Sequence, residues 1–497
     1  MDEYIIFNKR YVPCVEFDAN KNPSVRRFSL EEVQKIVDEE NKRNGEDLYF
    51  YMNMEEWMKI VDSARFHEVC AQMDMKIEEI MNSPEIIETR KHLCEEHDKS
   101  INGFMLPFKA KNNEDYEIKL NAKLKKFISE INRPAFRNDG ILVDDVEEIC
   151  KNVINALEAA KTGNNEEAEK ILQKILEEYK KNFFAVSELD KSYAFRGIAP
   201  FDNLKPQGAS KEIYENMMDG ELNFFRARVI NKNEEIQNKG EINYLPYSKR
   251  NLAKDMRFSS NGKVCLYLGV TSYVCSKECR WNGEDNLYLA SFKFNEKGKK
   301  LKIFNLIASE ALLNGLSNNI EKSDKELYKA MIKVFPLVIA TMFTISTPDE
   351  ERKKKYGETI KEEYLLSQIL MNVLQKSGID GVAYLSRQGK DDFDYPQLVC
   401  LAIPITDNSE NNEYGKLIED FEMTSPILYG KFENNSTYER GSYINEKWSI
   451  SGKESWEKDG CNAKIDYNGK TEFYQNTQFS KFDDFLVNQI HNEFVVS

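Results

Sequence analysis

Two arginines, a tyrosine and a glutamate lie close together in segment 222–281, and their side chains suit one kind of ligand. The planar forks of Arg226 and Arg257 can each hold a phosphate through two parallel hydrogen bonds. Tyr267 offers a ring for stacking, and Glu278 offers a negative charge that can stabilise a developing cation. The set therefore fits a ligand with two negative charges and a cationic ring, a class that includes NAD.

Two predicted elements position the tyrosine and the glutamate. Alternation of side chains over Val264–Val270 predicts a strand, with Tyr267 on the face opposite to the aliphatic residues. Either Thr271 or Ser272 is expected to cap a short helix that carries Glu278. The carboxylate is thus expected one short helix away from the end of this strand.

The arginines belong to neighbouring elements. Arg226 is predicted to end a strand that begins with Leu222–Phe225, and Arg257 comes just before a turn at Ser259–Gly262. Arg228 lies two residues after Arg226, so strand alternation puts both on the same face. Either of the two is therefore a candidate for the ligand contact, with Arg226 preferred.

A set of short motifs, taken in order, resembles the RES-domain family. The matching motifs are Phe225-Arg226, Arg257-Phe258-Ser259 before Gly262, Leu266-Tyr267-Leu268, Glu278, the helix Glu363–Gln368 and the block Gly378–Ser386. The family is named for an arginine, a glutamate and a serine, which correspond here to Arg226, Glu278 and Ser386. The resemblance covers about residues 222–405.

This resemblance implies both a fold and an activity. The implied fold is α+β, similar to ADP-ribosyltransferases, with a curved, mainly antiparallel sheet. The implied activity is destruction of NAD at the nicotinamide–ribose bond, by a glycohydrolase or by a phosphorylase that transfers the glycosyl group to phosphate. Such proteins are typically toxins paired with an antitoxin, so a role in bacterial defence and an antitoxin or regulatory partner are expected.

Each residue has a proposed role in such a reaction. NAD would be a substrate, and no cofactor or metal is expected. Arg226 and Arg257 are expected to clamp the pyrophosphate and the neighbouring ribose, and Tyr267 to stack on an aromatic ring of the ligand. Glu278 is expected to stabilise the ribosyl cation. Ser386 is expected to donate a hydrogen bond to the nicotinamide amide or to the ribose.

Other interpretations of these residues stay open. Arg257 could stabilise its turn, Tyr267 could pack in the core, Glu278 could face solvent on a polar helix, and Ser386 could be an ordinary loop serine. At the level of the protein, the alternatives are transfer of ADP-ribose to a macromolecular target, or a module that binds NAD or ADP-ribose without cleaving it. A pure binding module does not need Glu278, so the complete set favours an enzyme.

Composition excludes several other classes of protein. The net charge of −15 over 497 residues argues against nucleic-acid binding, which needs concentrated positive charge. No run of about 18 apolar residues predicts a membrane span. The start of the chain lacks a secretory signal, and the nine cysteines are scattered, as expected of reduced thiols. We therefore expect a cytoplasmic protein.

The chain is predicted to have three parts. Residues 1–200 are expected to be mostly helical and to regulate the protein or bind a partner, with a capping box at Ser29 and a helical hairpin over 144–181. Residues 201–405 are expected to form the RES-like NAD-cleaving domain. Residues 406–497 are expected to be a strand-rich extension that closes with a helix over Phe479–Phe494.

Overall fold

The computed structural model divides the chain into two compact units, Met1–Cys94 and Glu95–Ser497, and each is described by itself. The structure describes residues 4–8, 16–17, 23–24, 29–44, 49–53, 100–138, 140–195, 222–318, 324–358, 360–389, 397–434, 464–467, 470–474 and 477–495.

The first unit contains a helix packed beside a strand pair. Strand β1 (Tyr4–Asn8) pairs antiparallel with β4 (Tyr49–Asn53), β2 (Glu16–Phe17) pairs with β3 (Pro23–Ser24), and α1 spans Leu30–Asn44. The capping box is confirmed: the Ser29 N–H donates to the Glu32 carboxylate at 3.0 Å, and the Glu32 N–H donates to Ser29 Oγ at 3.4 Å. Val33 is buried against β4.

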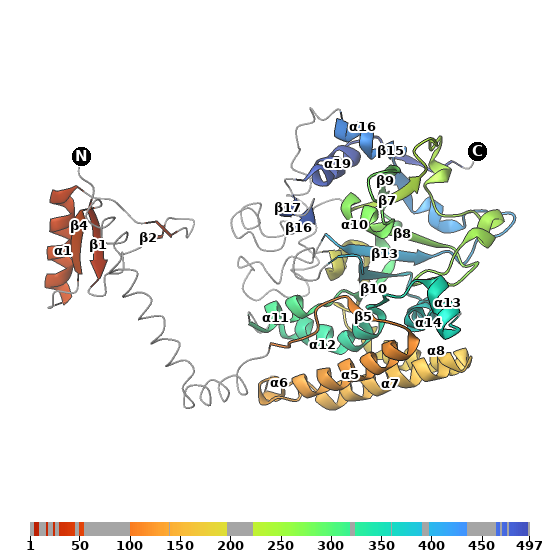
Figure 1. Ribbon diagram of the computed structural model, residues 1–497, viewed down its shortest axis with the longest axis horizontal. Coiled ribbons are helices and arrows are strands. Elements are labelled where there is room, and N and C mark those ends of the chain that lie inside the picture. The colour runs from red at the N-terminus through yellow and green to blue at the C-terminus, as the bar shows by residue number, and fades with distance from the viewer. Residues whose placement is uncertain are drawn as a thin grey trace. The chain divides into compact units, whose positions relative to one another are not determined.

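The second unit is built on a ten-stranded sheet, which confirms the predicted α+β class with a mainly antiparallel sheet (Figure 1). The strands in spatial order are β18 (Asn492–Glu493), β14 (Phe421–Met423), β9 (Asn286–Phe294), β7 (Asn223–Ile230), β8 (Cys265–Gly269), β13 (Val399–Pro404), β12 (Gly381–Leu385), β10 (Lys302–Leu306) and β6 (Val186–Glu188), and β15 (Ile427–Leu428) also pairs with β9. Among the described strand pairs of this sheet, β10 and β12 alone run parallel. The likeness to ADP-ribosyltransferases stays a prediction.

Helices cover the β10–β12 side of the sheet in two layers. Helices α12 (Asp324–Thr341) and α14 (Glu362–Lys376) contact β10 and β12, and α5 (Asn113–Ile131), α7 (Val143–Lys161) and α8 (Asn165–Tyr179) pack against them (Figure 1). The predicted helical hairpin is confirmed as α7 and α8. Helix α12 continues through Pro336, and its last turns are buried.

Shorter elements complete the second unit. The helices are α6 (Pro134–Asn138), α10 (Ser272–Glu278), α11 (Glu310–Asn318), α13 (Asp349–Tyr356), α16 (Tyr429–Asn434) and α19 (Gln478–Val487). The strands are β5 (Phe108–Ala110) with β11 (Phe343–Ile345), and β16 (Lys464–Tyr467) with β17 (Lys470–Phe473). The closing helix, α19, thus ends at Val487, earlier than the sequence predicted, and the chain then forms β18 on the sheet edge.

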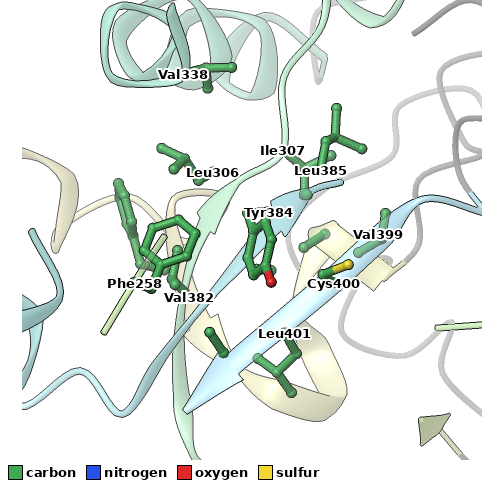
Figure 2. Close-up of a cluster of buried hydrophobic side chains, with 14 of the residues drawn as sticks. Phe258, Leu306, Ile307, Val338, Val382, Tyr384, Leu385, Val399, Cys400 and Leu401 are labelled. Atoms are coloured by element: carbon green, nitrogen blue, oxygen red, sulfur yellow. The ribbon is translucent and has the colours of Figure 1, made fainter. Parts of the chain in front are cut away.

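A buried cluster around strands β12 and β13 fixes the end of β12 (Figure 2). The rings of Phe258 and Tyr384 lie 4.7 Å apart, and Val338 from α12 reaches the same cluster. Leu385 and Val399 pair across β12 and β13. Because these side chains are buried, the backbone that leads into Ser386 is held by packing on both sides.

All three predicted parts contribute strands to this sheet. Strand β6 comes from residues before 200, and β14, β15 and β18 come from residues after 405. The division of the chain at residues 200 and 405 stays a prediction. The strands before, between and after these two positions belong to one sheet.

Candidate active site

A cavity opens where strands β7 and β8 separate. Strand β7 pairs with β9 along its whole length, from Asn223 to Ile230, but it pairs with β8 only where Phe225 faces Gly269. Residues of both strands next to this point line a cavity of about 430 Å³. Arg226 was predicted to end its strand; it lies in mid-strand because β9 supports β7 as far as Ile230.

Helix α10 covers the open edge of β7 and carries Glu278 to the cavity. Of the two predicted caps, Thr271 and Ser272, Thr271 is the N-cap: the Val274 N–H donates to its side chain at 3.1 Å. The thiol of Cys275 donates to the Phe225 carbonyl at 3.1 Å. Helix α10 also lies so close to the end of strand β8 that a Cβ at Gly269 would collide with Val274 and Cys275. The glycine therefore allows the approach that positions Glu278.

Glu278 and Ser386 meet although they are 108 positions apart in the chain. Ser386 follows β12 and is only 3% exposed, and its hydroxyl donates to Glu278 Oε1. The Gln388 N–H in turn donates to Ser386 Oγ at 3.1 Å. Ser386 was expected to donate to a ligand, but its proton is directed at Glu278, so the geometry fits a serine that orients the carboxylate.

Arg257 is a buried cation in the cavity wall. Its guanidinium donates to the Leu385 carbonyl at 2.9 Å and to Thr341 Oγ1 at 3.3 Å. It also lies 5.0 Å from the ring centre of Tyr384. Burial, and secondarily the positive charge of Arg387, lowers the pKa of Arg257. Among the described residues no carboxylate pairs with it, and its Nε is buried without a hydrogen bond. Such a site favours a bound anion.

Of the two arginines on β7, the structure brings Arg226 to the cavity. Arg226 is half-buried, and its Nε and Nη1 donate to the carbonyls of Ile242 at 2.7 Å and Tyr267 at 2.9 Å. The second bond bridges the two separated strands. Arg228 is exposed, donates to the Glu241 carbonyl and does not line the cavity. The contact of either residue with a ligand stays a prediction.

Tyr267 lines the cavity, and its hydroxyl is held by two neighbours. The Phe258 N–H donates to this hydroxyl at 3.2 Å, and Ser259 Oγ lies 2.9 Å from it. Burial raises the pKa of Tyr267 well above its ordinary value. The tyrosine thus ties strand β8 to the turn at Phe258 and Ser259.

Sequence reasoning assigned no role to several residues of the cavity wall, among them three cations and a tyrosine that lies beside two of these cations. These four residues are Arg280, Lys361, Tyr364 and Arg387. The guanidinium of Arg387 lies 4.9 Å from the ring centre of Tyr364, and Nζ of Lys361 lies 5.3 Å from the same ring. Arg387 directly follows Ser386, and Tyr364 lies inside the motif Glu363–Gln368, so both were adjacent to recognised positions.

The cavity is positively charged although the chain is acidic. Its wall contains five cationic side chains, Arg226, Arg257, Arg280, Lys361 and Arg387, and two acidic ones, Asp255 and Glu278. The chain as a whole carries a net charge of −15. A concave site with this local excess of positive charge attracts an anionic ligand, even with two carboxylates in its wall.

Across the described ranges, no three His, Cys, Asp or Glu side chains come together as ligands for a metal ion. In those ranges, too, every helix is too short or too polar to cross a bilayer.

The fold and the site define an α+β protein with a cationic cavity and one carboxylate–serine pair. No protein-family model matches the sequence. A protein of Bacillus subtilis (strain 168) named "Putative toxin YopC" is 26% identical over 219 residues, which are 43% of this chain and 47% of that protein. The match therefore spans about half the length of this curated relative.

Among solved structures, the chain matches part of the crystal structure of the M. tuberculosis MbcT–MbcA toxin–antitoxin complex. The match has a TM-score of 0.21 and 10% sequence identity, and it covers 42% of this chain and 85% of that chain.

Proposed function

We propose that this protein is an NAD-degrading enzyme that cleaves the nicotinamide–ribose bond. One observation carries the proposal: the hydrogen-bonded pair of Ser386 and Glu278 lies at a cavity whose wall has five cationic side chains. The cations suit the two phosphates of NAD. The carboxylate suits the positive charge that develops on the ribose when its bond to nicotinamide breaks.

The proposed reaction needs one carboxylate and a good leaving group. The bond between ribose C1′ and the pyridinium nitrogen breaks, and its electron pair goes to the nitrogen, so nicotinamide leaves as a neutral molecule. Glu278 stabilises the cation-like ribose that remains, and Ser386 holds the carboxylate in one orientation through its hydrogen bond. An acceptor oxygen then bonds to C1′ and gives up its proton.

The acceptor divides the proposal into two forms. Water as acceptor gives ADP-ribose and makes the protein a glycohydrolase, whereas inorganic phosphate gives a phosphorylated ADP-ribose and makes it a phosphorylase. Nicotinamide release by the purified full chain is measured by chromatography with and without phosphate. A rate that requires phosphate supports the phosphorylase, and an equal rate without phosphate supports the glycohydrolase. If no nicotinamide appears while ADP-ribose still binds, the protein is a binding module.

We further propose that NAD loss makes the protein a toxin or a defence effector held in check by an antitoxin or another regulatory protein. The relative from B. subtilis, whose name describes it as a toxin, supports this role. The test is induced expression in a bacterial host, with growth and cellular NAD as readouts. The wild type is expected to lower NAD before growth stops, and Glu278→Gln is expected to do neither.

A further inference from the structure

Helix α10 ends in an arginine whose backbone is left-handed. Arg280 has φ 52°, and among the described residues it is the one non-glycine with a positive φ. Its N–H donates to the Lys277 carbonyl at 2.9 Å, and the Trp281 N–H donates to the Ser276 carbonyl at 3.0 Å. These two bonds form a Schellman motif, in which this position is usually glycine because a Cβ crowds the backbone.

The residue that follows locks this helix end in place. The indole N–H of Trp281 donates to the Asp285 carbonyl at 2.8 Å, and its ring packs edge-on against Tyr429 at 5.5 Å. Arg280 therefore lies between an anchored tryptophan and Glu278, and it lines the same cavity. Nothing in this cap requires an arginine side chain, since glycine would satisfy the same two backbone bonds.

The guanidinium of Arg280 differs from those of the other cavity arginines. Arg226, Arg257 and Arg387 each donate to a backbone carbonyl. Arg280 is exposed to the cavity, and its side chain makes no hydrogen bond or ion pair with the rest of the described residues. Its planar fork is thus available for two parallel hydrogen bonds to one ligand group.

We propose that Arg280 is a further binding residue that holds the phosphate on the ribose contacted by Glu278. The identity of the ligand rests on the proposed function. With Glu278 at C1′ of that ribose, the nearest anionic group of NAD is the phosphate on C5′ of the same sugar. Among the cations of the cavity wall, Arg280 is the one nearest to Glu278 in the sequence, two residues beyond it, and a phosphate accepts both arms of its fork.

The experiment uses Arg280→Gly in the full chain, with ADP-ribose as the probe because it carries this phosphate and needs no catalysis. Glycine adopts the positive φ freely, so the melting temperature is expected to equal or exceed that of the wild type. The Kd for ADP-ribose, measured by calorimetry at low salt, is expected to rise about 10-fold. Arg280→Lys keeps the charge and is expected to bind with intermediate affinity.

The matched control is Arg250→Ala, which removes an exposed arginine outside the cavity wall and is expected to leave the Kd unchanged. An Arg280→Gly variant that keeps its melting temperature and binds ADP-ribose within twofold of the wild type overturns the inference, as does a wild type that binds no ADP-ribose. A wild type that binds ADP-ribose but releases no nicotinamide from NAD refutes the proposed function alone.

Discussion

Replacing Glu278 by Gln isolates the charge of the carboxylate from its position. The Gln side-chain oxygen can still accept the hydrogen bond from Ser386, so the local geometry is expected to survive. What disappears is the negative charge facing the cation that develops on the ribose. Removing one such preorganised group costs about 3–4 kcal/mol, so kcat is expected to fall roughly 100- to 1000-fold.

The assay is steady-state nicotinamide release at several NAD concentrations, with the melting temperature as the folding control. KM is expected to change little because binding of the phosphates depends on the cationic wall. Glu284→Gln is the matched control: this exposed acid lies six residues further on and outside the cavity wall, and its loss of charge is expected to leave kcat unchanged.

Two results would refute the role of Glu278. One is a Glu278→Gln variant that releases nicotinamide at the wild-type rate. The other is an equal loss of activity in Glu284→Gln, which would show that kcat responds to the overall charge near α10 and not to a carboxylate at the reacting bond.

The remaining predictions concern groups around the same cavity. Ser386→Ala should lower kcat about 10-fold with unchanged KM, measured by the same assay, because Glu278 keeps its charge but loses its orienting hydrogen bond. Arg257→Ala should raise KM for NAD about 10-fold or more, since a phosphate contact exists before the transition state as well. Asp483→Ala should lower the free energy of unfolding in urea by about 3 kcal/mol, because the Ser272 N–H and the Tyr474 hydroxyl, at 2.8 and 2.5 Å, lose their acceptor. ADP-ribose at 100 times its Kd should stabilise the fold by about 2.7 kcal/mol, seen as a higher melting temperature.

Local patterns predicted the elements that carry the cavity residues. The alternation over 264–270 corresponds to β8, and the capping threonine before Glu278 corresponds to the start of α10. Both signals are short-range: a strand shows its two faces in five to seven residues, and a helix start needs one side chain and one N–H. The sequence was informative here because the residues that determine strand β8 and the start of helix α10 lie within those elements or next to them.

Other features depend on partners that are distant in the chain. The full length of β7 follows from its pairing with β9, about sixty residues later, so Arg226 could not be placed in mid-strand from its own neighbours. The positive φ of Arg280 could not be predicted from the sequence, because arginine normally avoids that conformation. Arg387 enters the site only because β12 ends there, beside β13.

The cavity itself follows from one break in an otherwise continuous sheet. If β7 and β8 paired along their lengths, the backbone groups beyond Phe225 would bond to each other and leave no space between the strands. Instead Arg226 donates to the Tyr267 carbonyl across the gap, and the Cys275 thiol donates to the Phe225 carbonyl from α10. Side chains thus replace the missing ladder bonds, which keeps buried backbone groups satisfied and leaves room at the same point for a ligand. Arg226 therefore stabilises the fold in addition to its proposed contact with the ligand. Arg226→Lys keeps the charge but cannot make both hydrogen bonds to backbone carbonyls, so it should lower the free energy of unfolding more than Arg228→Lys does.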